Sequence, residues 1–165
     1  MFSAMEYYTE FSLHRKLTID LLISVSSSQL AEAPISKAGT LGKQFRHLND
    51  VSKCYTDALE NQKLVFERND VDHSLETDKS RLITELKLTK ERLRSFIESV
   101  DPAVFSQEII DCRESEKYVG VERTSPRIIV WWMIEHEIFH EGQLALYIRN
   151  FGTYFPESWK IWGLK

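Results

Sequence analysis

The stretch 126-PRIIVWWMIEHEIFHEGQLALYIRNF-151 decides the fold class of this 165-residue chain. It is apolar nearly all round, and a helix of that kind must be buried on more than one side. Ser125 can cap its start, and Pro126 suits the first turn because the missing proline N–H is not needed there. Gly152 supplies the left-handed position that follows many helices. We therefore expect one long helix that ends at Phe151 and is packed among others.

Three upstream segments, at about 8–30, 41–61 and 78–100, also carry apolar residues at helical spacing. Thr40 is a plausible N-cap of the second, and Pro102 stops the third. The predicted inward stripes are Leu13, Leu17 and Leu21; Leu41, Phe45, Leu48, Tyr55 and Leu59; and Leu82, Leu86, Leu93 and Ile97. The scarcity of glycine (6) and proline (4) favours long helices with short links. The sequence predicts an all-α fold: a four-helix bundle in one domain over residues 1–165.

The remaining segments are less regular. Residues 67–77 are polar and predict a loop, whereas residues 103–123 mix apolar and polar residues, which fits a small β-hairpin or an irregular crossover before the last helix. The tail 151-FGTYFPESWKIWGLK-165 is so aromatic that it must pack somewhere. It could cover the end of the bundle, join a partner subunit or wall the mouth of a site.

Composition excludes several function classes. Apolar residues make up 42% and charged residues 28%, as in ordinary soluble proteins, and a net charge of −4 gives no reason to expect nucleic acid or an anionic membrane as partner. The most apolar run, Leu17 to Val25, is broken by Asp20 and is too short to span a bilayer. The first residues do not form a secretory signal, so we expect a cytoplasmic protein.

The two cysteines, Cys54 and Cys112, are far apart in the sequence, which indicates reduced thiols and no disulfide.

His136 and His140 lie four residues apart and so project from one face of the last helix. Two interpretations stay open for such a pair: a metal site, or core histidines with hydrogen-bond partners. The pair is aimed into apolar surroundings, because its face also carries Ile129, Met133, Leu144 and Tyr147.

A metal held by this pair needs a third ligand. His47 is the natural candidate, since it flanks the inward stripe of the second helix, although alone it would be taken for an ordinary helix histidine. His14 falls outside the predicted stripe of the first helix, and His73 lies in the polar loop, so neither is preferred.

The string from His136 to His140 also matches H-E-x-x-H, the zinc-protease motif in which the glutamate is the general base. The longer form of that motif needs a third histidine at the position of Leu146, and little chain follows to build a substrate lobe. We therefore expect no protease. Glu137 could support a ligand or act as a base, but the simplest prediction is a solvent-facing charge.

The chain resembles the DinB/YfiT-like family of bacterial metal-binding four-helix proteins. The resemblance rests on FRHLND at 45–50, on H-x-x-x-H followed by G-Q in HEIFHEGQLALYIRNFG at 136–152, on the helix order and on the long crossover. It implies that His47, His136 and His140 bind one divalent ion, most often zinc or nickel, with iron, manganese and cobalt also suited to imidazole. It further implies open positions for water or substrate, a homodimer and, in some relatives, activation of a low-molecular-weight thiol.

The predicted function is a divalent-metal-dependent enzyme, a hydrolase or low-molecular-weight-thiol transferase, acting on a small molecule. The alternative is a non-catalytic metal-binding or stress-related bundle. Three protein ligands favour the enzyme, because structural zinc sites usually close with four. Gln143 could orient a ligand or be a core-edge amide, and Cys54 is best interpreted as a small buried hydrophobe. The apolar surface of the last helix exceeds what one bundle requires, which predicts a homodimer.

Overall fold

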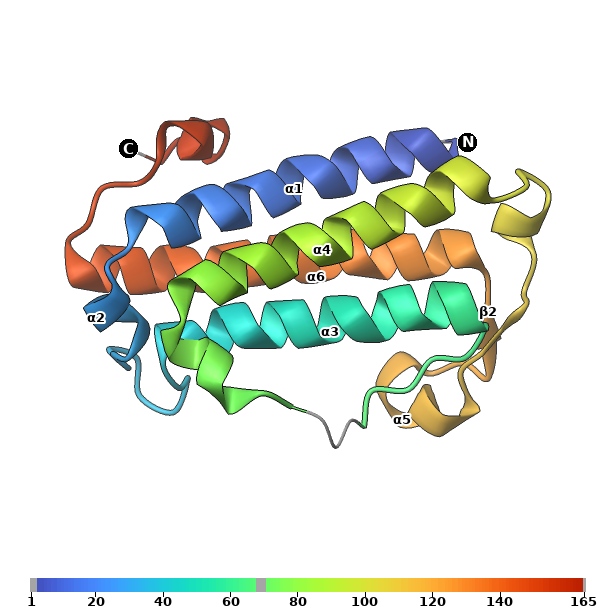
Figure 1. Ribbon diagram of the computed structural model, residues 1–165, viewed down its shortest axis with the longest axis horizontal. Helices are drawn as coiled ribbons and strands as arrows, with labels where there is room; N and C mark the ends of the chain where they lie inside the picture. The colour runs from blue at the N-terminus through green and yellow to red at the C-terminus, as the bar shows by residue number, and fades with distance from the viewer. Residues whose placement is uncertain (1–2, 68–70, 165) are drawn as a thin grey trace.

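The computed structural model describes residues 3–67 and 71–164 of the chain. Four long helices lie side by side in this part of the chain: α1 (Ala4–Ser24), α3 (Leu41–Asn61), α4 (Lys79–Ser99) and α6 (Pro126–Phe151) (Figure 1). The shorter elements are α2 (Ser27–Leu30), α5 (Glu116–Val119), the strands β1 (Ile110–Asp111) and β2 (Arg123–Thr124), and the 3-10 helices η1 (His73–Thr77), η2 (Val104–Ser106), η3 (Arg113–Ser115) and η4 (Glu157–Trp162). The described fold is mostly helical with one small two-stranded sheet, which confirms the all-α class.

The capping residues predicted from the sequence lie at the ends of helices α3 and α6. The hydroxyl of Thr40 accepts from the Lys43 amide at 3.0 Å, and α3 begins and ends where predicted. Ser125 caps α6, and Gly152 follows it in the left-handed conformation. The third predicted helix, α4, is one residue shorter at each end, with Asp78 as its N-cap.

The single first helix predicted at about 8–30 is wrong. Helix α1 begins earlier, at Ala4, because the side chains and amides of Ser3 and Glu6 form a capping box. It ends at Ser24, Val25 is extended, and Ser26 caps the separate helix α2. The chain therefore turns where the sequence pattern suggested continuous helix.

The inward stripe predicted for α1 is wrong at one position. Leu13 is 37% exposed, whereas Leu17 and Leu21 are buried as expected. His14 and Arg15 are buried in its place. The reason is that α1 packs against both α4 and α6, so it buries two faces, one of which is polar.

A polar layer crosses the middle of the protein. Helices α1 and α3 each pack against both α4 and α6, and the apolar core between them falls into two clusters, one including Leu30 of α2 and the other Ile110 of β1. The buried polar side chains of the long helices that lie between the clusters along the sequence are His14, Arg15, Asn49, Ser52, Thr89, Glu137, His140 and Glu141. Each long helix thus interrupts its apolar face near its centre.

The crossover before α6 is a small sheet with helical turns inserted. Strand β1 pairs antiparallel with β2, with Ile110 opposite Thr124, so the predicted pair of strands is present. Between them stand η3 and α5, which a tight hairpin would not contain. The loop predicted at 67–77 lies partly outside the described residues, and its described part includes η1, capped by Asp72. Among the described helices, none has an apolar stretch that would cross a membrane.

Candidate metal centre

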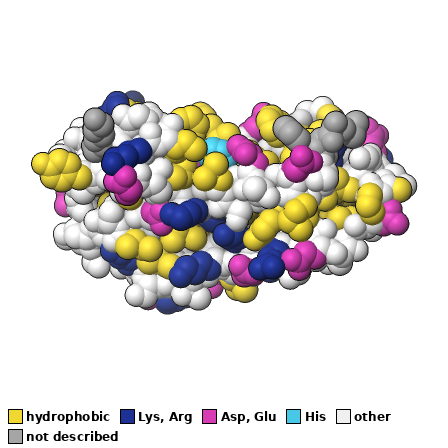
Figure 2. All heavy atoms as spheres, turned by 90° about the horizontal axis from the view of Figure 1, so that it is seen from above, with side chains coloured by type: hydrophobic (Ala, Val, Ile, Leu, Met, Phe, Trp, Pro, Cys, Tyr) yellow, Lys and Arg dark blue, Asp and Glu magenta, His cyan; other side chains and the backbone are white. Residues whose placement is uncertain are grey.

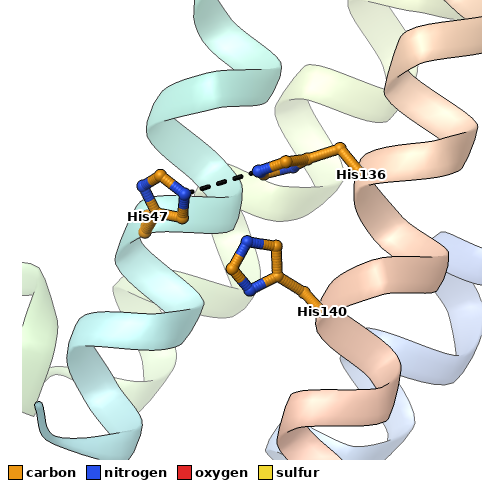
Figure 3. A group of neighbouring side chains, drawn as sticks. All are labelled: His47, His136 and His140. Atoms are coloured by element: carbon orange, nitrogen blue, oxygen red, sulfur yellow. Dashed lines mark hydrogen bonds between the residues drawn. The ribbon is translucent and has the colours of Figure 1, made fainter. Parts of the chain in front are cut away.

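The structure brings together the three histidines that the sequence singled out. His47 comes from α3, while His136 and His140 come from α6, and their rings point toward one another across the groove between the two helices (Figure 3). The ring centres lie 4.5 to 5.2 Å apart. One nitrogen from each ring lies within 4.8 Å of the other two.

This spacing fits a divalent metal. The Nε2 atoms of His47 and His136 are 3.4 Å apart, and two nitrogens bound to zinc at 2.0–2.1 Å with a tetrahedral angle would lie about 3.3–3.4 Å apart. A direct hydrogen bond between ring nitrogens would be long at this distance. One nitrogen of His140 faces the other two rings (Figure 3), while its Nδ1, on the far side of the ring, is buried and has no hydrogen-bond partner among the described residues. Neutral imidazole nitrogens suit zinc, nickel and other first-row ions.

The electrostatics of the site favour uncharged rings. Burial lowers the pKa of all three histidines, and the other histidines of the group lower it further for His136 and His140. The pKa of His136 falls to about 3 and that of His140 to about 4. All three rings are therefore neutral at physiological pH, which is the form that binds a metal.

The site is open on one side. His140 is buried, His136 is half-buried and His47 is exposed. A cavity of about 440 Å³ has His47 and His136 in its wall. An ion held by the three rings would therefore be reachable by a small molecule from this cavity.

Glutamates that follow the α6 histidines anchor that helix to α1. Glu137 is fully buried, with one oxygen 2.5 Å from Nη2 of Arg15 and the other accepting from the Thr18 hydroxyl at 2.7 Å. Glu141 accepts from Nδ1 of His14 at 3.0 Å. The prediction of a solvent-facing Glu137 is wrong, because a step of about 100° per residue turns this side chain from the site toward α1, where a guanidinium receives it. The Glu137 carboxylate therefore does not face the three histidines, as the general base of a zinc protease would.

Two further residues from the sequence analysis lie near the histidines. Gln143 is half-buried, and its side-chain amide opposes the fall in the pKa of His140. Cys54 is buried, as predicted, and it lines the same cavity as His47. His73 lies in η1 beside Glu76, away from the site.

The aromatic tail packs on α1 and α6 and does not line this cavity. The Trp159 indole is buried and donates to the carbonyl of Leu17 at 2.9 Å. The Trp162 indole donates to Glu141 at 2.9 Å, on the face of α6 that meets His14 of α1. Of the three placements that the sequence left open, the structure shows packing against the chain's own helices.

The sequence analysis did not identify His14 and Arg15 as the residues of α1 that bind α6. The sequence does contain a pattern that indicates this contact. The adjacent basic residues His14 and Arg15 pair with the acidic residues Glu141 and Glu137, which directly follow the histidines of α6. Only the packing of α1 on α6 makes that match visible.

Comparison with known proteins agrees with this architecture. The family model described as the DinB family matches residues 1–158. The chain is similar to the crystal structure of a DinB-like protein, YjoA, from Bacillus subtilis, with a TM-score of 0.70 and 19% identity over 93% of this chain and 97% of that one. At this identity the likeness shows the fold alone. A search of curated proteins gave no match. Because the family model covers nearly the whole sequence, the chain belongs to the DinB family.

Proposed function

We propose that this protein is a divalent-metal-dependent enzyme acting on a small molecule, with His47, His136 and His140 as its protein ligands. The observation that carries the proposal is the convergence of three neutral imidazoles beside an open cavity. Three protein ligands leave coordination positions for water or substrate, whereas structural zinc sites usually close with four. Zinc or nickel is the proposed ion, and iron, manganese and cobalt also suit the nitrogen donors.

The ion, when bound, would lower the pKa of a bound water or thiol and so supply a nucleophile near neutral pH. The chain's own contribution is to hold the rings in place. Glu137 and Glu141, tied to α1, fix the rotation of α6 that presents His136 and His140 to α3. The reaction class is a hydrolase or a low-molecular-weight-thiol transferase. Proteolysis is not proposed, because the glutamate of H-E-x-x-H is held by Arg15.

Elemental analysis of the purified and metal-loaded protein tests the site. We expect about one ion per chain, lost in His140→Ala but kept in the control Phe139→Ala, whose side chain is 65% exposed on the same helix. His140→Ala should keep its helical circular dichroism, because two apolar clusters supply most of the stability. Equal metal content in both variants would refute the assignment.

An activity screen tests the reaction class. The metal-loaded protein should turn over members of a panel that pairs low-molecular-weight thiols with electrophiles, or small esters and amides, and His140→Ala should not. The rival function is a non-catalytic metal-binding or stress-related protein. If removal of the metal by a chelator alone collapses the helical signal, the ion is structural and the rival is favoured.

We further propose that the four long helices form one bundle domain and that two copies associate as a homodimer. Side chains on the outer face of α6 support the dimer: Trp131, Ile138 and Leu146 are 41%, 38% and 50% exposed. Figure 2 shows hydrophobic side chains reaching the surface in clusters, with charged groups between them. Sedimentation showing a monomer at high concentration would contradict the dimer.

A further inference from the structure

The cavity beside the histidines has an aromatic wall. Tyr55 comes from α3, Phe66 from the segment that follows it, and Tyr118 from α5. The Phe66 ring centre lies 5.4 Å from that of Tyr55 and 5.6 Å from that of Tyr118, with the rings at 84° and 88°. These are edge-to-face pairs, the geometry that aromatic rings prefer. A further ring could join the group in the same way.

The wall is fixed in place by buried polar contacts. The Ser115 hydroxyl, just before α5, donates to the Leu64 carbonyl at 3.0 Å and accepts from the Phe66 amide at 3.2 Å. The Leu64 amide donates to the Asp111 carbonyl at 2.8 Å. The crossover is thus attached to the segment after α3, and the rings that the two contribute are held together before any ligand arrives. Such preorganisation lowers the cost of binding.

The charge at the other side of the cavity is already compensated. Among the described residues that line the cavity, Arg46 is the one lysine or arginine, and it forms ion pairs with Asp50 and, at 2.8 Å, with Glu76. It is therefore not free to neutralise a phosphate or a second carboxylate. An ion held by His47, His136 and His140 would then be the partner for one negative or polar group of a ligand in this cavity.

We propose that the cavity binds the aromatic ring of a small substrate against Phe66 and Tyr118, while a single neutral or monoanionic donor on that substrate reaches the ion. This inference rests on the proposed function, because it assumes the metal site and adds the chemical class of the substrate. The cavity volume of about 440 Å³ lies toward the lower end of the range for small-molecule pockets. The pocket thus suits a compact arene with one polar head and does not suit a polyanion.

Calorimetric titration of the zinc-loaded protein with two hydroxamates tests the proposal. Benzohydroxamate and acetohydroxamate carry the same metal-binding head, so only the ring differs. We expect the aromatic probe to bind about tenfold more tightly, and Phe66→Ala or Tyr118→Ala to remove most of that preference. Tyr118→Phe keeps the ring and should keep the preference. Tyr154→Ala, a control at a side chain that is 85% exposed and outside the cavity, should keep it too.

A second measurement needs no metal. In the metal-free protein, benzamide should shift the aromatic proton resonances of Phe66 and Tyr118, and acetamide should not. Equal affinity for the two hydroxamates would overturn this inference, and so would a preference for benzohydroxamate that is unchanged in both alanine variants. Neither result would contradict the proposed metal site. If neither hydroxamate binds the zinc-loaded protein, the proposed function fails with it.

Discussion

The buried ion pair between Arg15 and Glu137 offers the sharpest test of the packing. Both side chains are fully buried, and Nη2 of Arg15 lies 2.5 Å from the carboxylate. The guanidinium also donates to Ser52 and lies 5.1 Å from the centre of the Phe11 ring. The variant Glu137→Leu leaves this cation buried without a countercharge. Breaking a buried pair from one side costs about 3–5 kcal/mol, a large part of the roughly 5–15 kcal/mol that stabilises a typical domain.

Replacing both partners should be far less harmful. In the double variant Arg15→Met/Glu137→Leu no charge is stranded, and apolar groups of similar volume fill the site between the two apolar clusters. We expect the double variant to lie within about 2 kcal/mol of the wild type, because buried pairs and hydrophobic replacements are often nearly equivalent. The two substitutions should therefore be strongly non-additive.

Urea denaturation followed by circular dichroism measures all of these variants. The matched control is the pair Lys16 and Asp20 on the same helix, with side chains 60% and 26% exposed, whose removal should cost less than about 1 kcal/mol. A loss below about 1 kcal/mol in Glu137→Leu, or a double variant as unstable as the sum of the single ones, would refute the reasoning.

Four further variants test consequences of the local geometry. Gly42→Ala should destabilise the protein by about 1–3 kcal/mol or more, because the new Cβ would lie 1.8 Å from a backbone carbonyl oxygen of η1. Gly142→Ala has open space around the new Cβ and should stabilise α6 by about 1 kcal/mol in the same urea denaturation. Asn49→Leu should raise the free energy of unfolding by about 1–3 kcal/mol, since neither atom of the buried amide has a hydrogen-bond partner among the described residues, and a loss of stability would contradict this. Burial opposes the charged form of His14, but its carboxylate partners, Glu141 first, outweigh burial and raise its pKa above 6.5. Its stabilising contribution is therefore complete below pH 6.5 and is lost as pH rises through the raised pKa, and His14→Gln should flatten that decline in urea melts measured across pH.

Local signals in the sequence were enough to predict α3 and α6. Thr40, Ser125 and Gly152 act on backbone groups a few residues away, so the helix ends could be found without knowing the packing. Helix α1 was misplaced although its start at Ser3 and the start of α2 at Ser26 carry capping boxes of the same local kind, because the prediction followed apolar spacing instead. Its middle turn is buried but polar, and a search for apolar stripes selects Leu13, which is exposed, over Arg15, which is not.

The candidate site was partly predictable, because part of it depends only on the spacing of residues along one helix. Helical spacing alone places His136 and His140 on one face, and the third histidine came from its position on α3 and from the family resemblance. The environment of Glu137 could not be predicted, because its partners on α1 are more than a hundred residues away in the sequence. The aromatic wall of the cavity was equally hidden, since Phe66 follows α3 and Tyr118 lies in the one-turn helix α5, and the two segments meet through the Ser115 hydroxyl and backbone hydrogen bonds about fifty residues apart in sequence.

The pairing of α1 with α6 also bears on the order in which the chain can fold. Thr18 and His14 meet their glutamate partners 119 and 127 residues later in the sequence. During synthesis α1, α3 and α4 emerge before α6 does, and packing those three alone would leave the Arg15 guanidinium without the carboxylate that receives it. A three-helix intermediate is therefore disfavoured, and docking of α6 should coincide with the cooperative step. Contacts this distant in sequence also slow a helical protein relative to one built from neighbouring hairpins.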